Sequence, residues 1–158
     1  MGEILSREQL CERAEEARTE GRTIAFANGC FDLLHVGHIR YLEAAAQEAD
    51  LLVVALNDDD SVRRLKGQGR PILPASARAE LVAALRCVDF VVVFPDATVG
   101  PLLQLLRPDV HCKGTDYTVE SVPERKIVEA YGGRTAIVGD PKDHSTRDLL
   151  VRIASSDQ

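Results

Sequence analysis

The sequence predicts an α/β domain, and three observations support this prediction. The apolar segments are short and continuous, as in LLVVAL and FVVVF, which is typical of strands buried on both faces of a parallel sheet. Segments with a helical pattern separate them along the chain. The length of 158 residues fits one domain of ordinary size. We therefore expect a single doubly wound, Rossmann-like domain with a five-stranded parallel sheet.

The elements are predicted in order from their start signals and patterns. Ser6 and Gln9 form a capping box that opens the first helix, and Gly and Pro mark residues 66–74 as a loop. We expect an N-terminal helix within 1–21, a core of 22–154 and a frayed tail of 155–158. The predicted strands are 22–28, 50–57, 89–94, 109–112 and 134–139, and the predicted helices are about 7–20, 37–48, 59–65, 75–86, 98–106, 123–133 and 145–154.

Composition excludes several classes of protein. The net charge of −6 argues against broad binding to nucleic acid or to anionic membranes, which need an excess of Lys and Arg. No apolar run approaches the roughly 20 residues of a membrane span. The start, MGEILSREQL, lacks the features of a signal peptide, and four separated cysteines fit neither a zinc site nor a disulfide framework. We expect a cytoplasmic protein.

Polar residues follow the predicted strands, where a doubly wound sheet binds its ligands. Asn28 to His38 follow the first strand, and Asn57 and Asp58 follow the second. Lys113 to Asp116 follow the fourth strand, and Gly139 to Thr146 follow the fifth. We expect these segments to surround one ligand site.

His35 and His38 enclose a glycine at the start of a predicted helix. With Asp32 they could ligate a metal, although no nearby pattern supplies the further ligand that zinc needs. They could also have a purely structural role. The third interpretation is phosphate binding, because a helix N-terminus offers N–H donors, Gly37 lacks a Cβ that would obstruct the phosphate, and imidazoles add directed donors.

The segment NGCFDLLHVGHIRYL resembles the H-x-G-H signature of the nucleotidyltransferase superfamily, with N-G-x-F-D at the usual distance before it. Further along, LNDDDSVRRLKGQGRPI, ARAELVAALRCVDFVVVF, PDVHCKGTDY, VEAYGGR and GDPKDHST follow in the order found in one family. In that order they resemble the heptose 1-phosphate adenylyltransferase (ADP-heptose synthase) domain family. The resemblance covers about residues 22–153.

The resemblance implies roles for individual residues. His35 and His38 would hold the triphosphate and stabilise the departing pyrophosphate, with Lys66 and Lys113 at the flanking phosphates. The implied nucleotide-binding residues are Asn28, Gly29, Cys30, Phe31, Gly37, Asp116, Ser145 and Thr146, and the implied substrate-binding residues are Asp32, Asn57, Asp58, Arg78 and Tyr117.

Several of these positions have structural alternatives. Asp58 to Asp60 could cap the short helix, and Arg64 and Lys66 could be a solvated helix end. Ser145 with Asp148 would make a capping box without any ligand. Two positions depart from the family pattern: Thr115 replaces a glycine of K-G-G-D-Y, and Arg147 replaces the second threonine of Ser-Thr-Thr.

The expected reaction is the transfer of AMP from ATP to a sugar 1-phosphate, namely heptose 1-phosphate, with release of pyrophosphate. The resemblance implies ATP as substrate, Mg²⁺, small-molecule partners and a homodimer. No sugar kinase precedes the domain in this sequence, so we expect a separate kinase to make the acceptor. The alternatives are a glycerol 3-phosphate type cytidylyltransferase, an FMN adenylyltransferase and a non-catalytic nucleotide-binding module.

Overall fold

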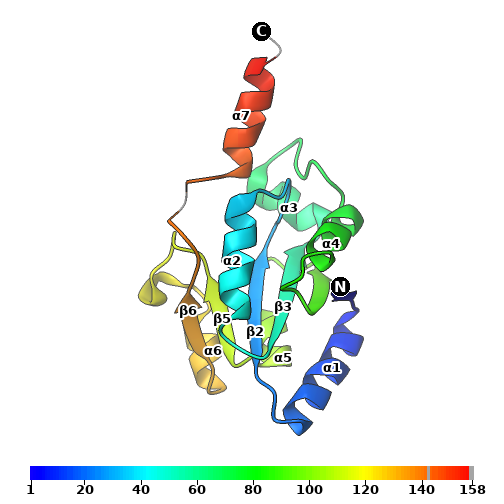
Figure 1. Ribbon diagram of the computed structural model, residues 1–158, viewed down its shortest axis with the longest axis vertical. Coiled ribbons are helices and arrows are strands. Elements are labelled where there is room, and N and C mark those ends of the chain that lie inside the picture. Colours follow the sequence, from blue (N-terminus) through cyan, green and yellow to red (C-terminus); the bar gives the residue numbers. More distant parts are fainter. Residues whose placement is uncertain (142, 157–158) are drawn as a thin grey trace.

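A computed structural model, which describes residues 1–141 and 143–156, contains a parallel sheet between two layers of helices (Figure 1). In the described part of the chain the sheet has six strands in the order β1-β4-β3-β2-β5-β6. The strands are β1 (Glu3–Ile4), β2 (Ile24–Gly29), β3 (Leu51–Asn57), β4 (Phe90–Phe94), β5 (Val110–Lys113) and β6 (Arg134–Ile137). The helices are α1 (Arg7–Thr19), α2 (Val36–Ala46), α3 (Asp59–Lys66), α4 (Ala75–Ala83), α5 (Gly100–Leu106), η1 (Val119–Ser121), α6 (Arg125–Ala130) and α7 (Thr146–Ser156).

The α/β prediction is confirmed, but the expected number of five strands is wrong. The additional strand, β1, has two exposed residues and pairs in parallel with the edge strand β4, opposite Phe90 and Val91. A two-residue segment has no alternation or apolar run that could be recognised. Backbone pairing creates this strand, for example through the amide of Leu5, which donates to the carbonyl of Val91 at 2.8 Å.

The central strands are buried on both faces, and successive residues point to opposite helix layers. In β3, Leu52, Val54 and Leu56 pack in the cluster that includes residues of α2 and α4. Leu51 and Val53 pack in the other cluster, with residues of α1, α5 and α6. Burial on both sides explains why these strands are continuous apolar runs in the sequence.

Strand order reverses next to β2. Chain order runs from β2 through β3 to β4 on one side, and β5 and β6 lie on the other side. The carboxyl ends of β2 and β5 therefore flank the crevice in which doubly wound sheets bind ligands. These ends are at the top of Figure 1, as is the start of α2.

The predicted helices are present, with different ends. The capping box of Ser6 and Gln9 is confirmed. Helix α4 stops at Ala83, before the expected end at 86, and α6 covers only part of the expected 123–133. Helix α7 extends to Ser156 and projects from the rest of the domain (Figure 1), while residues 157–158 of the expected tail lie outside the described residues.

The described helices include none that is long and apolar enough to cross a membrane. The four cysteines are unbridged, and Cys112 is buried.

Candidate active site

The N-terminus of α2 is built around His35 and His38. His35 is the N-cap, and its Nδ1 accepts from the amide of Gly37 at 3.1 Å. The Nδ1 of His38 accepts from the amide of His35 at 3.3 Å. The two rings stack with their centroids 3.9 Å apart. Because both Nδ1 atoms are acceptors, a neutral ring carries its proton on Nε2, so each imidazole has a donor on the edge away from the helix backbone.

Gly37 is required for this cap. A Cβ at this position would lie 2.9 Å from Cε1 and 3.0 Å from Nδ1 of His35, closer than nonbonded atoms approach. The sequence suggested that Gly37 gives a phosphate access to the backbone. The structure adds a second reason for glycine, because any side chain would displace the His35 ring from its capping position.

The loop after β2 positions Phe31 beneath the histidines. Phe31 and Leu33 have positive φ angles of 49° and 51°, which are uncommon for residues other than glycine. The Phe31 ring is buried, with its centroid 5.4 Å from that of His38. A Cβ on Gly29 would lie 3.1 Å from this ring. Backbone conformations of this kind often occur at functional sites, where surrounding packing maintains them.

Asp32 stabilises the loop that follows α3. Its carboxylate accepts from Nε of Arg70 at 3.0 Å and from the amides of Ile72 and Leu73 at 2.7 and 3.0 Å. Burial favours a raised pKa for Asp32, but these two amides and Arg70 outweigh it and lower the pKa. The side chain is only 1% exposed. Both of its oxygens accept bonds within the protein, so the structure gives Asp32 a positioning role, and its predicted contact with substrate stays a prediction.

Arg78, a predicted substrate-binding residue, bonds within the protein. Its guanidinium is fully buried and donates to the carbonyls of Cys30 and Asn57 at 2.7 and 2.8 Å. It also donates to the carbonyl of Leu73 and to the carboxylate of Asp59. These bonds join the segments that follow β2 and β3. Arg78 therefore holds these two segments of the site together, and its predicted contact with substrate stays a prediction.

Asp58 is the N-cap of α3. Its carboxylate accepts from the amide of Ser61 at 2.8 Å, which confirms the capping alternative for this residue. Both Asp58 and Arg78 lie outside the lining of the cavity described next.

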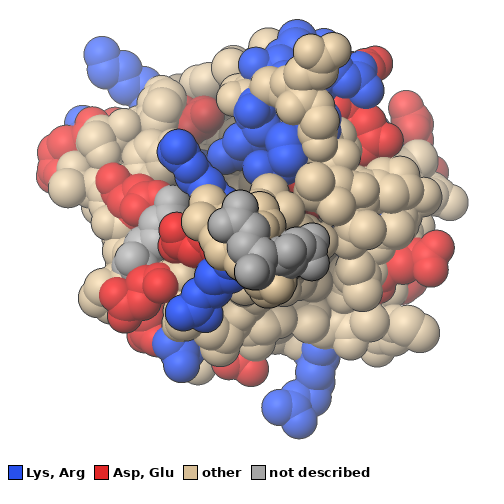
Figure 2. Space-filling view, turned by 90° about the horizontal axis from the view of Figure 1, so that it is seen from above, with Lys and Arg blue, Asp and Glu red and all other residues tan. Residues whose placement is uncertain are grey.

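The other predicted site residues line one open cavity of about 1280 Å³ at the carboxyl ends of the strands. Figure 2 is seen from above, onto this end, and Lys and Arg side chains gather near the middle of the face although the net charge is −6. The basic residues of the lining are Arg40, Lys66, Arg70, Lys113 and Arg147. The predicted residues of the lining are Asn28, Gly29, Cys30, Phe31, Asp32, His35, Gly37, His38, Asn57, Lys66, Lys113, Asp116, Tyr117, Ser145 and Thr146.

Lys113 extends from the end of β5 into this cavity. Burial lowers its pKa, and the carboxylate of Glu124 opposes that shift. Its Nζ lies 4.7 Å from the centroid of the Tyr117 ring, a cation–π contact. A partly desolvated ammonium group next to an open cavity is stabilised when an anion binds beside it.

The segment before α7 also lines the cavity and is held to the loop after β2. The Thr146 hydroxyl donates to the carbonyl of Asp32 at 2.6 Å, and the amide of Asp148 donates to Oγ of Ser145 at 3.1 Å. The side chain of Ser145 therefore caps α7, which is one of the two bonds of the predicted capping box. Arg147, the residue that departs from the family pattern, also lines the cavity.

Sequence reasoning did not select some residues of the lining. His144 stands 6.4 Å from His35, ring centroid to ring centroid. Tyr41 donates from its hydroxyl to the carbonyl of Cys112 at 2.6 Å, and the ion pair of Arg40 and Asp140 spans 3.3 Å. His144 and Asp140 lie within GDPKDHST, so the position after the fifth strand was the available signal. No sequence signal marked Arg40 and Tyr41 as site residues, because they resemble ordinary residues of a helix.

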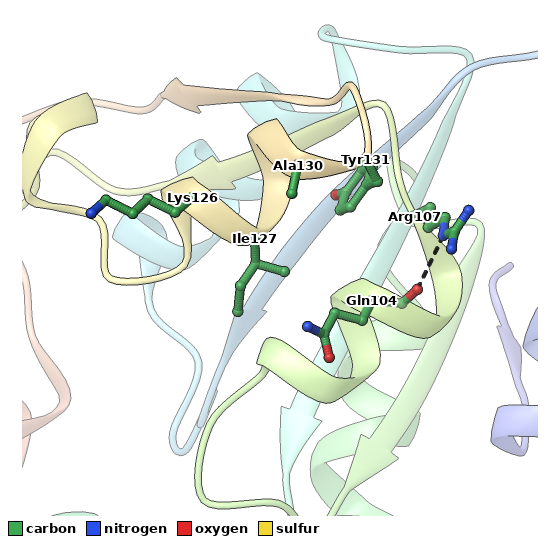
Figure 3. A pocket seen from close by; sticks show the side chains of 6 residues that line it. All are labelled: Gln104, Arg107, Lys126, Ile127, Ala130 and Tyr131. Carbon is green, nitrogen blue, oxygen red and sulfur yellow. Dashed lines mark hydrogen bonds between the residues drawn. The ribbon is translucent and has the colours of Figure 1, made fainter.

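A second hollow of about 460 Å³ lies between α5 and α6 (Figure 3). None of the predicted site residues lines it. It is formed by Gln104, Arg107, Lys126, Ile127, Ala130 and Tyr131.

A cavity with a histidine pair at a helix N-terminus, two lysines and a second helix N-terminus is suited to binding a chain of phosphates. The model of the cytidylyltransferase-like family matches residues 26–155. The chain belongs to this family and is an enzyme of the nucleotidyltransferase class.

The similar curated proteins include the bifunctional protein HldE of Syntrophotalea carbinolica, which is 48% identical over 150 residues, 95% of this chain and 31% of that protein. HldE of Alcanivorax borkumensis is 45% identical over 154 residues, 98% of this chain and 32% of that protein. The chain thus spans about a third of the length of these relatives.

Solved structures share the fold. A lipopolysaccharide core biosynthesis protein from Thermoplasma volcanium superposes with a TM-score of 0.67 at 24% identity, over 77% of this chain and all of that one. Pantoate-beta-alanine ligase from Francisella tularensis, in complex with beta-gamma ATP and beta-alanine, gives 0.65 at 15% identity, over 99% of this chain and 77% of that one. At these identities the likeness concerns the fold alone.

Proposed function

We propose that this chain transfers AMP from ATP to a sugar 1-phosphate, with heptose 1-phosphate as the acceptor, and releases pyrophosphate. The observation that carries the proposal is the arrangement of His35 and His38, whose Nδ1 atoms both bind backbone amides. Membership of the cytidylyltransferase-like family supports the reaction type. The HldE relatives and the resemblance to the ADP-heptose synthase family support the acceptor.

His35 and His38 would bind the triphosphate through Nε2–H. Their donors stand at the positive end of the α2 dipole, where anions are favoured. Negative charge grows on the bridging oxygen as pyrophosphate leaves. Donors that are already oriented stabilise this charge without reorganisation, which is the largest contribution in many transfer reactions.

Lys66 and Lys113 would neutralise the phosphates on either side, and the start of α7 would bind the outer phosphates. The Thr146 hydroxyl already donates to Asp32, so the backbone amides of α7 and the side chain of Arg147 are the available donors there. The backbone of Asn28 to Phe31 and the side chain of Asp116 would contact the nucleotide. Asn57 and Tyr117 would contact the acceptor.

The reaction needs no nucleophile from the protein. An oxygen of the sugar phosphate, already anionic near neutral pH, attacks the α-phosphorus of ATP. A new P–O bond forms to the acceptor, the bond from the α-phosphorus to the pyrophosphate oxygen breaks, and that oxygen keeps the electron pair. The protein brings two anions together and balances their charge, which is catalysis by positioning and electrostatics.

Mg²⁺ fits this site as a companion of the triphosphate. Among the described residues no group of three or more His, Cys, Asp or Glu side chains could hold a metal without the substrate. Mg²⁺ is commonly bound by one or two carboxylates together with substrate phosphates. Asp116 and Asp148 line the cavity and would supply these carboxylates. A bound Mg²⁺ would offset the charge of the phosphates.

The test is pyrophosphate release with Mg²⁺, crossing ATP, CTP, GTP and UTP with heptose 1-phosphate, glycerol 3-phosphate and FMN. Release with ATP and heptose 1-phosphate alone is the expected result. Release with a different pair would overturn the proposed substrates and keep the class of reaction. ATP binding without release for any acceptor would support a binding module. We also propose a homodimer in the cytoplasm, and light scattering on the purified chain tests the dimer.

A further inference from the structure

His111 is a polar side chain in the middle of the sheet that the mechanism above does not use. It is the second residue of β5, opposite Phe26 of β2, and it is fully buried. Its ring meets that of Phe26 edge to face, with centroids 5.9 Å apart. From the sequence it belongs to an ordinary strand, DVHC, in which an apolar residue would serve equally well.

Within the described part of the chain, the His111 ring makes one hydrogen bond, and its partner is a residue of the candidate site. Nε2 of His111 lies 2.8 Å from Oδ1 of Asn28, at the end of β2. Nδ1 is buried and has no hydrogen-bond partner among the described residues. Burial lowers the pKa of His111 to about 3, with a smaller contribution from the charge of Lys113, so the ring is neutral at physiological pH.

The direction of this hydrogen bond follows from the surroundings of the ring. A neutral imidazole has one donor and one acceptor nitrogen, and an amide oxygen can only accept. With the proton on Nε2, the ring donates to Oδ1 and leaves a lone pair on Nδ1. The opposite tautomer would bury an N–H donor on Nδ1 without an acceptor, which is the more costly arrangement.

We propose that His111 is a positioning residue that fixes the side-chain amide of Asn28, with Oδ1 toward the sheet and the NH₂ group toward the cavity. Asn28 lines the cavity where β2 and β5 diverge. An asparagine that rotates freely would also present its oxygen, which repels a phosphate. Held in this way, Asn28 offers only donors, and its partner is an acceptor atom of the nucleotide. The identity of that ligand rests on the proposed function.

The orientation can be measured without substrate. In the full chain labelled with ¹⁵N-histidine, long-range ¹H–¹⁵N correlation distinguishes the two tautomers. We expect His111 to carry its proton on Nε2 and to stay neutral from pH 5 to 8. We also expect the Asn28 NH₂ signals to shift when ATP is titrated. A proton on Nδ1 would mean that the amide faces the other way and would overturn the proposal.

Two variants test the consequence for binding. His111→Leu keeps an apolar side chain in the core but removes the donor, and we expect the Kd of ATP to rise about three- to tenfold, as for a lost hydrogen bond. Its melting temperature should change little, because removal of the unsatisfied Nδ1 offsets the loss of the bond to Oδ1 of Asn28. His111→Gln retains an N–H at a similar reach and should keep Kd within about twofold. A folded His111→Leu variant with the wild-type Kd would overturn the proposal.

The outcomes separate this proposal from the proposed function. An Nε2–H tautomer with ATP-dependent Asn28 signals, together with no pyrophosphate release for any substrate pair, would support the pairing and overturn the reaction. Pyrophosphate release together with a proton on Nδ1 of His111 would support the proposed reaction and overturn the pairing of His111 with Asn28.

Discussion

The two helix N-termini at the cavity are built in different ways. Helix α2 follows directly from the central strand β2, and its Leu42 and Ala45 are fully buried against the sheet. Helix α7 has no buried residue among those described, and Val151 and Ile153 are each 59% exposed. Its start is held to the loop after β2 through the hydroxyl of Thr146, which donates to Asp32 at 2.6 Å.

This difference divides the phosphate site into a preformed half and a half with little support. The donors of α2 are fixed by packing before any ligand arrives, so they can act on charge that develops only in the transition state. The donors of α7 must be ordered when the ligand binds, which reduces the net affinity that they add. We therefore expect changes around α2 to affect stability and kcat, and changes around α7 to affect KM.

The largest expected effect is on stability, at Arg78, which joins the segments that follow β2 and β3. Arg78→Ala leaves the carbonyls of Cys30 and Asn57 without their donor, and we expect a loss of about 3 to 5 kcal/mol in the free energy of unfolding. Urea denaturation measures this loss. Arg64→Ala is the control, because Arg64 is exposed and bonds only weakly to the carbonyl of Pro95, and it should change stability by less than about 0.5 kcal/mol. Equal stabilities of the two variants would contradict the role of Arg78.

The next effect is on catalysis at α2. His38→Ala should lower kcat by about 10²- to 10³-fold, the usual cost of removing one oriented donor from a transition-state site. The Kd of ATP should change much less. His38→Gln, whose terminal amide reaches further, should retain more activity than His38→Asn. Steady-state kinetics and calorimetric titration give both quantities, and an unchanged kcat would exclude the proposed role.

The pH dependence of stability tests His111, the buried residue that bonds to Asn28 at the end of β2. His111 has a pKa of about 3 in the folded state and about 6.5 when unfolded. The unfolded chain therefore binds the extra proton first on acidification, and stability is lost as pH falls below about 6.5. Between pH 7 and 5 we expect a loss of about 2 kcal/mol from this group. Urea denaturation at the two pH values measures this loss, and the His111→Leu variant should not show it. Identical pH dependence of stability in the variant and the wild type would contradict the prediction.

The smallest effect is expected at α7. Thr146→Val removes the hydroxyl that donates to Asp32, and we expect a three- to tenfold higher KM for ATP, equivalent to about 1 kcal/mol, with kcat nearly unchanged. The melting temperature should hardly move, because α7 covers none of the core. Thr146→Ser keeps the hydroxyl and should behave as the wild type. A large fall in the melting temperature of Thr146→Val would show that α7 is not the weakly supported half.

The segments that hold the candidate site residues could be predicted from the sequence, because their local structure depends on residues nearby in the chain. His35 caps α2 through Gly37, two residues away, and the apolar run of β3 reports its burial directly. Strand β1 was missed, since only pairing with a distant strand makes two exposed residues a strand. The backbone contacts of Arg78 were also not predicted, because an arginine near a predicted site has the same sequence signature whether it binds substrate or backbone.

By itself the sequence determined the parallel α/β class, the histidine pair at a helix start and the placement of polar residues after strands. All of these arise from short-range patterns of hydrophobicity and capping. The tertiary structure decided which polar groups remain for a ligand. Asp32 and Arg78 form their hydrogen bonds inside the protein, and Nε2 of His111 bonds to Oδ1 of Asn28. Such assignments depend on contacts between residues 21 to 83 positions apart, which only folding brings together.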